Sequence, residues 1–400
     1  VLSGGTAYNA SVLSGGTQWV LESGVAAYTD IDGGVQSVVG SSHIIFPESS
    51  ALYTSATVSE TKVHNQGQQH LSSGGVAIKT SVYDGGIQYI HSSGIASGTQ
   101  VGNGGSQVIS SGGVANDAII SSAGSQIVEN GGTANRTTLL SGGEQHVSSG
   151  GMVNDTVISE GGLQFIADGG IVDGAVIYNS GAQHISSGGT ISSAVISGGG
   201  SMVVDDGGLA DDTTIESGGK QDISSGGIAS NTTVNFGGSQ TVSNGGLAQD
   251  TTINEGGSQS VLEGGKASNT EINGGVQDIS GEAASTIINN GGVQNIFSGG
   301  IASDTDIHDG TQNVFDGGTT SNTSINENSV QNISSGGAAS STDIQGGTQN
   351  VLAGGSSIDT TMSSGTVNLY EGGSISGFNA HGGLLNVYGD NTLAGNTVLT

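Results

Sequence analysis

The sequence predicts an all-β fold, a right-handed parallel β-helix (solenoid) of about 20 coils with a repeat of about 19 residues. A glutamine returns every nineteen residues through the middle of the chain, and two Gly-Gly pairs accompany it in each period. Valine, isoleucine and leucine fall at fixed phases of this period, while the glycine pairs interrupt every candidate helix. The crossover rule for parallel strands favours the right-handed coil.

Each period offers three short strands between three glycine-rich or polar corners. Gln240 and Val242 share parity, so both face the same side of one strand, and Thr251 and Ile253 repeat this relation in another. Two aliphatic columns, running from Ile90 to Val261 and from Val82 to Ile272, are therefore expected to point inward. Coils stacked about 4.8 Å apart place each aliphatic residue over its equivalent and give a rod of roughly 90–100 Å.

The glutamine column is interpreted as a structural ladder of stacked amides in preference to a ligand-binding stripe. The column of threonines is expected to suit β-strands and to form hydroxyl ladders. The Gly-Gly corners need positive φ or close approach of neighbouring coils. Asparagine and aspartate beside the repeated alanine, which we place at a corner, are ordinary turn formers.

The repeat is irregular in three places. Residues 37–68 hold the single proline and interrupt the period, which we interpret as a protruding loop or hairpin in preference to a decayed coil. The coils shorten near residues 273–288, and the signature degenerates over residues 356–400. We nevertheless predict one continuous domain over 1–400, whose first residue falls in mid-repeat as in a segment of something longer.

The composition excludes several classes of function. Five basic residues against 34 acidic ones give a formal net charge of −29, which repels nucleic acid and anionic lipid. The chain has no cysteine, so disulfides and thiolate metal sites are excluded. It also lacks an apolar run of the length, about 18 residues, that could span a bilayer as a helix.

A search for catalytic chemistry leads to no catalytic, cofactor or metal residue. The paired acids Asp205-Asp206 and Asp211-Asp212 occupy turn positions without aromatic platforms or basic partners. The eight histidines lack metal-binding spacing. His70, His146 and His184 share the outward position after the glutamine and are interpreted as scattered surface residues.

The motifs at 225–234 (Ser-Gly-Gly-Ile-Ala-Ser-Asn-Thr-Thr-Val) and 237–246 (Gly-Gly-Ser-Gln-Thr-Val-Ser-Asn-Gly-Gly) resemble the repeats of self-associating autotransporters. That family includes the adhesin involved in diffuse adherence, TibA and antigen 43. The resemblance covers nearly the whole chain, and the segment from Phe46 to Tyr53 departs from it.

This resemblance implies a right-handed β-helical passenger, secreted through a C-terminal outer-membrane barrel that is absent from this sequence, and displayed outside a Gram-negative cell. It implies host-cell adherence, autoaggregation and biofilm formation. Some members are O-heptosylated on repeat serines by a dedicated heptosyltransferase. The candidate acceptors are serines at exposed corners: Ser148, Ser149, Ser186, Ser187, Ser224 and Ser225.

The mechanism expected for such a rod is binding through its sides, either to a second copy in antiparallel alignment or to a host receptor or glycan. Weak polar contacts would add along the coils. The candidate self-association residues are polar corner residues: Asn154, Asp155, Asp211, Asp212, Asn231 and Asp250. Two alternatives remain, a β-helical polysaccharide-degrading enzyme (a lyase or a tailspike-like hydrolase) and a passive glycosylated spacer.

Overall fold

The computed structural model describes all residues except 41–54, 149, 390, 395–397 and 400. The chain divides into two compact units, Val1–Val203 and Val204–Thr400. Each unit is a parallel β-solenoid, and no helix occurs among the residues described. The all-β solenoid predicted from the nineteen-residue repeat is thus confirmed, whereas the prediction of a single domain over 1–400 stays a prediction.

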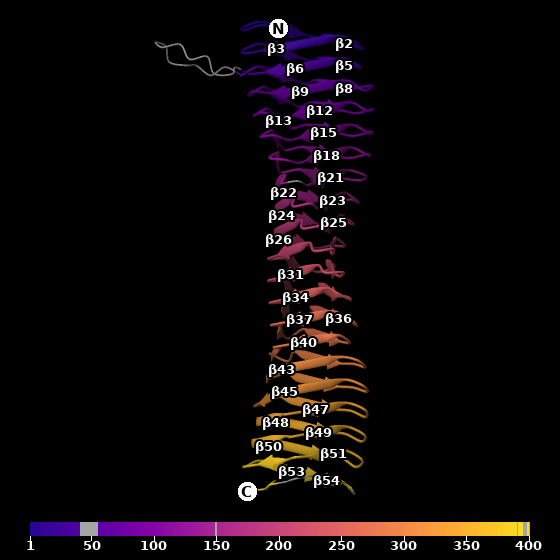
Figure 1. Cartoon of the computed structure of the whole chain (residues 1–400), viewed down its shortest axis with the longest axis vertical. Helices are drawn as coiled ribbons and strands as arrows, with labels where there is room; N and C mark the ends of the chain where they lie inside the picture. The colour runs from indigo at the N-terminus through magenta and orange to yellow at the C-terminus, as the bar shows by residue number, and fades with distance from the viewer. Residues whose placement is uncertain (41–54, 149, 390, 395–397, 400) are drawn as a thin grey trace, which may run out of the picture. The chain divides into compact units, whose positions relative to one another are not determined.

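Each coil has three faces, separated by three corners. In one coil of the first unit the faces are β15 (Ser106–Ile109), β16 (Val114–Asn116) and β17 (Ile119–Ile120). The first face carries the glutamine, the second carries the alanine and the third carries the other aliphatic residue. β15, β16 and β17 pair in parallel with the same faces of the next coil, so that equivalent residues lie over one another. Figure 1 shows the strands of successive coils stacked in this way.

The strands of the first unit repeat this order. The first face comprises β3 (Thr17–Leu21), β6 (Val35–Val39), β9 (Gln68–Ser72), β12 (Ile87–Ile90), β15, β18 (Ser125–Val128), β21 (Glu144–Val147), β23 (Leu163–Ile166) and β25 (Ala182–Ile185). The second face comprises β1 (Thr6–Tyr8), β4 (Val25–Ala27), β7 (Thr57–Ser59), β10 (Val76–Ile78), β13 (Ile95–Ser97), β16 and β19 (Thr133–Asn135). The third face comprises β2 (Ser11–Leu13), β5 (Asp30–Asp32), β8 (Lys62–His64), β11 (Ser81–Val82), β14 (Gln100–Val101), β17 and β20 (Thr138–Leu139). The second and third faces merge in β22 (Met152–Ile158), β24 (Ile171–Ile177) and β26 (Thr190–Ile196), and β27 (Ser201–Val204) is a first-face strand at the unit boundary.

The second unit is built in the same way. Its first face comprises β30 (Lys220–Ile223), β33 (Ser239–Val242), β36 (Ser258–Val261), β39 (Val276–Ile279), β42 (Val293–Ile296), β44 (Thr311–Val314), β46 (Val330–Ile333) and β53 (Leu384–Val387). Its second face comprises β28 (Leu209–Asp211), β31 (Ile228–Ser230), β34 (Leu247–Gln249), β37 (Lys266–Ser268), β40 (Glu282–Ala284), β47 (Ala338–Ser340), β49 (Ser356–Ile358), β51 (Ser374–Ser376) and β54 (Thr392–Ala394). Its third face comprises β29 (Thr214–Ile215), β32 (Thr233–Val234), β35 (Thr252–Asn254), β38 (Glu271–Asn273), β41 (Ile287–Asn289), β52 (Asn379–Ala380) and β55 (Val398–Leu399). The second and third faces merge in β43 (Ile301–His308) and β45 (Thr319–Asn326), and the third face merges with the following first face in β48 (Asp343–Val351) and β50 (Thr361–Leu369).

The interior contains three columns of apolar side chains, one more than the sequence predicted. The two aliphatic columns are buried as expected. The alanine that we placed at a corner is the inward residue of the second face, and it packs with first-face aliphatics, as Ala229 and Ala248 do in the cluster with Ile223 and Val242. Complete burial of one valine or isoleucine side chain contributes about 1.5–3 kcal/mol, so the piled columns are the main stabilising feature of each unit.

The glutamine ladder is confirmed. Gln126 donates from Nε2 to Oε1 of Gln107 at 2.6 Å, and both side chains are fully buried. The prediction of threonine hydroxyl ladders is wrong for most of the column, because the threonine hydroxyl faces the ladder across the interior. Thr137, for example, donates to Oε1 of Gln126 at 3.1 Å. The two columns form one buried polar network, in which Oε1 of Gln126, for example, accepts from Gln145 and from Thr137.

The two glycines of a corner have different tasks. Gly112 has a φ of +80°, the left-handed region that glycine adopts at no steric cost. Gly113 instead lies against the preceding coil, where an added Cβ would be 2.2 Å from the carbonyl oxygen of Ile90. The first glycine is therefore required for its backbone conformation and the second for the close approach of the neighbouring coil, the two reasons that the sequence indicated.

The three irregular segments keep the register of the ladder. β6 pairs with β9, and Gln69 donates to Gln36 at 2.7 Å across the interval that contains residues 41–54. Of the segment predicted to interrupt the repeat, residues 37–68, the structure describes 37–40 and 55–68, which carry the end of β6 together with β7 and β8. Residues 41–54, which include Phe46 to Tyr53, lie outside the described residues, so the predicted loop stays a prediction there. The shortened coils keep Gln277 opposite Gln259. Over residues 356–400 the strands continue, with buried Val367 at the position of the glutamine.

Candidate functional site

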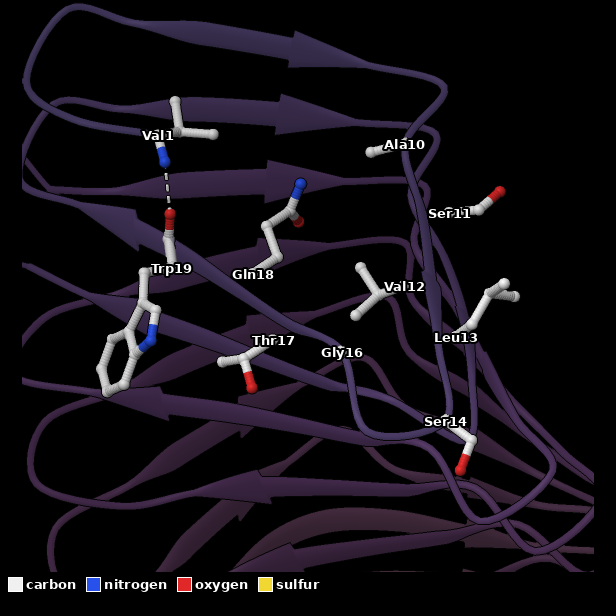
Figure 2. Close-up of a pocket in the computed structure, with 10 residues that line it drawn as sticks. All are labelled: Val1, Ala10, Ser11, Val12, Leu13, Ser14, Gly16, Thr17, Gln18 and Trp19. Atoms are coloured by element: carbon white, nitrogen blue, oxygen red, sulfur yellow. Dashed lines mark hydrogen bonds between the residues drawn. The ribbon is translucent and has the colours of Figure 1, made fainter.

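The hollow at the first coil has no acid or base among its lining side chains. The hollow at the first coil is lined by Val1, Ala10, Ser11, Val12, Leu13, Ser14, Gly16, Thr17, Gln18 and Trp19, none of which has a titratable side chain. Figure 2 shows the side chains of Val12 and Gln18 beside this hollow and the indole of Trp19 pointing away from them. Among the described residues no group of three histidine, aspartate or glutamate side chains could hold a metal ion. No helix in the described part of the chain is long and apolar enough to cross a membrane.

The polar corner between the second and third faces carries all six candidate self-association residues. In the first unit, Asn154 donates from Nδ2 to Oδ1 of Asn135 at 2.8 Å, so its amide is engaged along the corner. Asp155 follows it, exposed and with a left-handed φ of 55°. Aspartate tolerates this conformation better than most residues, which explains its place in the turn.

The same corner in the second unit brings together Asp211, Asp212, Asn231 and Asp250. Asp211 accepts from Ser230 at 2.9 Å and from Asn231 at 2.8 Å. The side-chain hydrogen bonds from Asn231 and Ser230 lower the pKa of the Asp211 carboxyl below its ordinary value. Asp212, Asn231 and Asp250 are exposed, and each has a φ of 52°. Asn269 donates from Nδ2 to Oδ1 of Asp250 at 3.1 Å, and a carboxylate can accept about four hydrogen bonds, so this contact does not saturate Asp250.

The corner between the first and second faces carries the candidate acceptor serines. Ser187 and Ser225 are exposed, and both have a left-handed φ of 48°. Ser148, Ser186 and Ser224 precede the turn and are half-buried, while Ser149 lies outside the described residues. This corner is outward-facing in both units, so hydroxyls at the turn position are accessible to a modifying enzyme.

Sequence reasoning missed an organised column on the first face of the first unit. The outward residues that follow the glutamine lie over one another on seven successive coils: His70, Tyr89, Val108, Ile127, His146, Phe165 and His184. We call this column the aromatic strip. The histidines were interpreted as scattered, which is wrong, because parallel in-register pairing stacks each of them on an aromatic ring of a neighbouring coil.

The stacking in the aromatic strip is close. His70 and Tyr89 have ring centroids 4.8 Å apart, and His146 and Phe165 have centroids 5.0 Å apart. Burial, followed by the nearby His91, lowers the pKa of His70 below its ordinary value. A signal for this strip was present in the sequence, since Tyr89 and Phe165 occupy the same phase on coils next to the histidines.

The first face of the second unit has a different outward column, which sequence reasoning also missed. Asn313 donates to Asn295 at 2.9 Å, and Asn332 donates to Asn313 at 2.9 Å. The same donation continues through Asn350, Asn368 and Asn386 at 2.8 Å each. The repeated Gln-Asn pair was the available signal. These amides bond to one another, so this ladder stabilises the face in the same way as the buried glutamines do.

One further histidine lies at the corner between the third and first faces. His64 Nε2 lies 2.6 Å from Oδ1 of Asp30, and its ring stacks on Tyr83 at 5.0 Å. Burial and the neighbouring carboxylates, Asp30 first, raise the pKa of Tyr83. Asp32 Oδ1 lies 4.0 Å from His64 Nδ1, so the group has the contacts of surface carboxylates around an imidazole that is packed on a ring.

The described residues thus define a class of protein: a repetitive β-solenoid that presents ordered columns of side chains along its faces and corners. Residues 225–275 match the family described as AIDA, "adhesin of bacterial autotransporter system, probable stalk". Among solved structures, the TibC-catalysed hyper-glycosylated TibA55-350 fragment is 30% identical, covering 83% of this chain and 99% of that fragment, with a TM-score of 0.45.

A second solved structure, the receptor binding domain of the siphovirus 9NA tailspike, is 10% identical over 99% of this chain and 74% of its own, with a TM-score of 0.14, which is too low to indicate a shared fold. No curated protein matches the chain at a significant level. On the identity and coverage of the TibA fragment, together with the family match, the chain belongs to the AIDA/TibA family of autotransporter adhesin passengers. Membership makes it a surface-exposed passenger of Gram-negative bacteria and indicates a non-enzymatic adhesin.

Proposed function

We propose that this chain attaches the bacterium to host cells and to other bacteria, and so produces autoaggregation and biofilm. It acts outside the cell through its exposed faces and corners, against a second copy in antiparallel alignment or against a host receptor or glycan. Family membership supports the adhesive role, and the repetition of exposed polar side chains on successive coils supports binding through the sides.

The observation that carries this proposal is the polar corner of Asp212, Asn231 and Asp250. Equivalent positions recur at about the 4.8 Å spacing of parallel strands, so one contact that fits is repeated on the next coil. Contacts that are weak singly become strong when many form between the same two surfaces. Because the formal net charge is −29, self-association should strengthen as salt screens the repulsion between copies.

A cell-settling assay tests the proposal. Alanine replacing Asn154, Asp155, Asp212, Asn231 and Asp250 together should slow settling of cells that display the passenger, because the corner loses its polar groups. As a control for altered folding, alanine replaces three residues of the outward asparagine column of the second unit, Asn313, Asn332 and Asn350. Cells that display this variant should settle as fast as the wild type. Unaltered settling of the corner variant, or full adhesion by a tethered truncated passenger, would favour a passive spacer instead.

We further propose that a heptosyltransferase adds O-linked heptose to serines of the corner between the first and second faces. The candidates are Ser148, Ser149, Ser186, Ser187, Ser224 and Ser225. Support comes from the similar TibA fragment, which is glycosylated by TibC, and from the exposed turn positions of Ser187 and Ser225.

Intact mass measurement of the passenger from its native host tests this modification. Replacing Ser187 and Ser225 by alanine should remove discrete sugar masses. The control replaces Ser192 and Ser230 by alanine, because their hydroxyls donate to Asp173 at 2.8 Å and to Asp211 at 2.9 Å and are thus engaged. A native mass equal to the polypeptide mass would exclude the modification.

A further inference from the structure

The aromatic strip presents ring edges to solvent. Phe165 lies between His146 and His184 with ring centroids at 5.0 and 5.5 Å and interplanar angles of 13° and 18°. Both faces of the Phe165 ring are therefore covered by imidazoles, and a sugar has no free ring face there on which to stack. A ring edge carries partial positive charge, and an imidazole adds N–H donors. This part of the strip is suited to a partner that supplies carboxylate or amide oxygens.

The chain itself carries acids with the spacing of these histidines. His146 and His184 are two coils apart, with Phe165 between them. Asp212 and Asp250 are also two coils apart, with Asn231 between them, and all three are exposed. Since each coil adds about 4.8 Å, both pairs repeat at roughly 10 Å.

We propose, on the basis of the self-association proposed above, that His146 and His184 of one copy of this chain bind Asp212 and Asp250 of a second copy. The edge of Phe165 then faces Asn231, whose amide oxygen can accept from a ring C–H. Charge complementarity selects this partner, because the rest of the surface is strongly acidic and repels another copy. The aromatic strip contains no acidic residue, so the carboxylates of a second copy can approach it without repulsion from the strip residues themselves.

Few charged groups surround the two histidines. His146 Nε2 lies 3.2 Å from Oε2 of Glu144 on the same strand, and the strands on either side, β18 and β23, carry no titratable side chain. His184 is flanked by β23 and β27, which likewise carry none. Each imidazole can donate a ring N–H to a carboxylate of the second copy.

Sedimentation of purified protein with exchanged charges tests the contact. The first variant carries His146→Asp and His184→Asp, and the second carries Asp212→His and Asp250→His. At about pH 5.5 the wild type should associate at least about tenfold more tightly than the first variant, which opposes acids with acids. An equal mixture of the two variants should recover association, because the acids of the first variant meet the histidines of the second.

A matched control replaces Asp304 and Asp359 by histidine. Both are exposed at the same kind of corner with φ of 53° and 54°, and the charge change is the same. Asp304 and Asp359 are three coils apart, so their spacing does not match that of His146 and His184, which are two coils apart. This variant should associate like the wild type, and circular dichroism should show the same strand content in all variants.

The outcomes separate this inference from the self-association on which it rests. If the first variant associates like the wild type, or if mixing the two variants recovers nothing, the contact between strip and corner is wrong while self-association stands. If the wild type stays monomeric from about pH 5.5 to about pH 7.5 and displaying cells do not settle, both ideas are wrong. Loss of association in the control would also overturn the contact, since spacing would then have no role.

Discussion

Replacing Gln107 by methionine should break the glutamine ladder at a point where the neighbouring side chains cannot repair it. Gln107 donates to Oε1 of Gln88 at 2.7 Å and accepts from Nε2 of Gln126 at 2.6 Å. After the replacement, Oε1 of Gln88 keeps the hydroxyl of Thr99 at 3.1 Å. The amide of Gln126 loses its acceptor. No threonine hydroxyl can accept from this amide instead, because the position that a threonine would occupy is Ala118.

The magnitude follows from these contacts. A buried amide left without an acceptor costs about 1–3 kcal/mol, and the other lost hydrogen bond contributes about 1 kcal/mol. Methionine has nearly the length of glutamine, and buried Met202 occupies the equivalent position in its own coil, so the cavity term is small. The expected loss of local stability is therefore about 2–4 kcal/mol.

Hydrogen exchange of the backbone amides in β15 and β18 is the suitable assay, because coils of a solenoid can open locally and a single global free energy need not describe them. The control is Gln100→Met, the same change at an exposed position, which should shift stability by less than about 0.5 kcal/mol. Gln145→Met should be intermediate, since Gln164 keeps a hydrogen bond to Thr156 at 3.2 Å. Unchanged protection around Gln107→Met would refute the view that the ladder stabilises the fold.

Three further changes have defined outcomes. Gly113→Ala should destabilise the first unit by about 3 kcal/mol or more in urea unfolding, because its Cβ would lie 2.2 Å from the carbonyl oxygen of Ile90; wild-type stability would show that the coils can separate there. Met202→Gln should stabilise the neighbouring coil by about 1 kcal/mol in hydrogen exchange, because it supplies a donor to the buried, unpaired Oε1 of Gln183; a lower stability would contradict this. Asp211→Asn should be less stable than the wild type at neutral pH, and the difference should vanish in acid. The pKa of the folded carboxyl is lowered, so its stabilisation is present above the ordinary value of 3.8 and disappears as the pH falls through the folded value; a difference that persists in strong acid would contradict the assignment.

The candidate site was predictable only in part. Ser187, Ser225, Asp212 and Asp250 could be placed at exposed corners from the sequence, because glycine, asparagine and aspartate fix turns through local conformational preferences. Which of their neighbours they bond was not predictable, since the donors to Asp211 come from the next coil. The aromatic strip was missed for the same reason, because the rings of His146 and Phe165 meet only when two coils are stacked in register.

The sequence by itself determined the period, the strand-and-corner pattern and the inward direction of the aliphatic and glutamine columns. These follow from chain-local facts: alternation along a strand, the conformational demands of glycine, and burial of apolar side chains. Only the tertiary structure decided that the threonines bond the glutamines, that the alanines form a third apolar inward column, and that aromatic rings and asparagines line different outward columns. Those outcomes depend on distances between coils and across the interior, where side chains far apart in the chain compete for the same partners, and a linear pattern carries no measure of such distances.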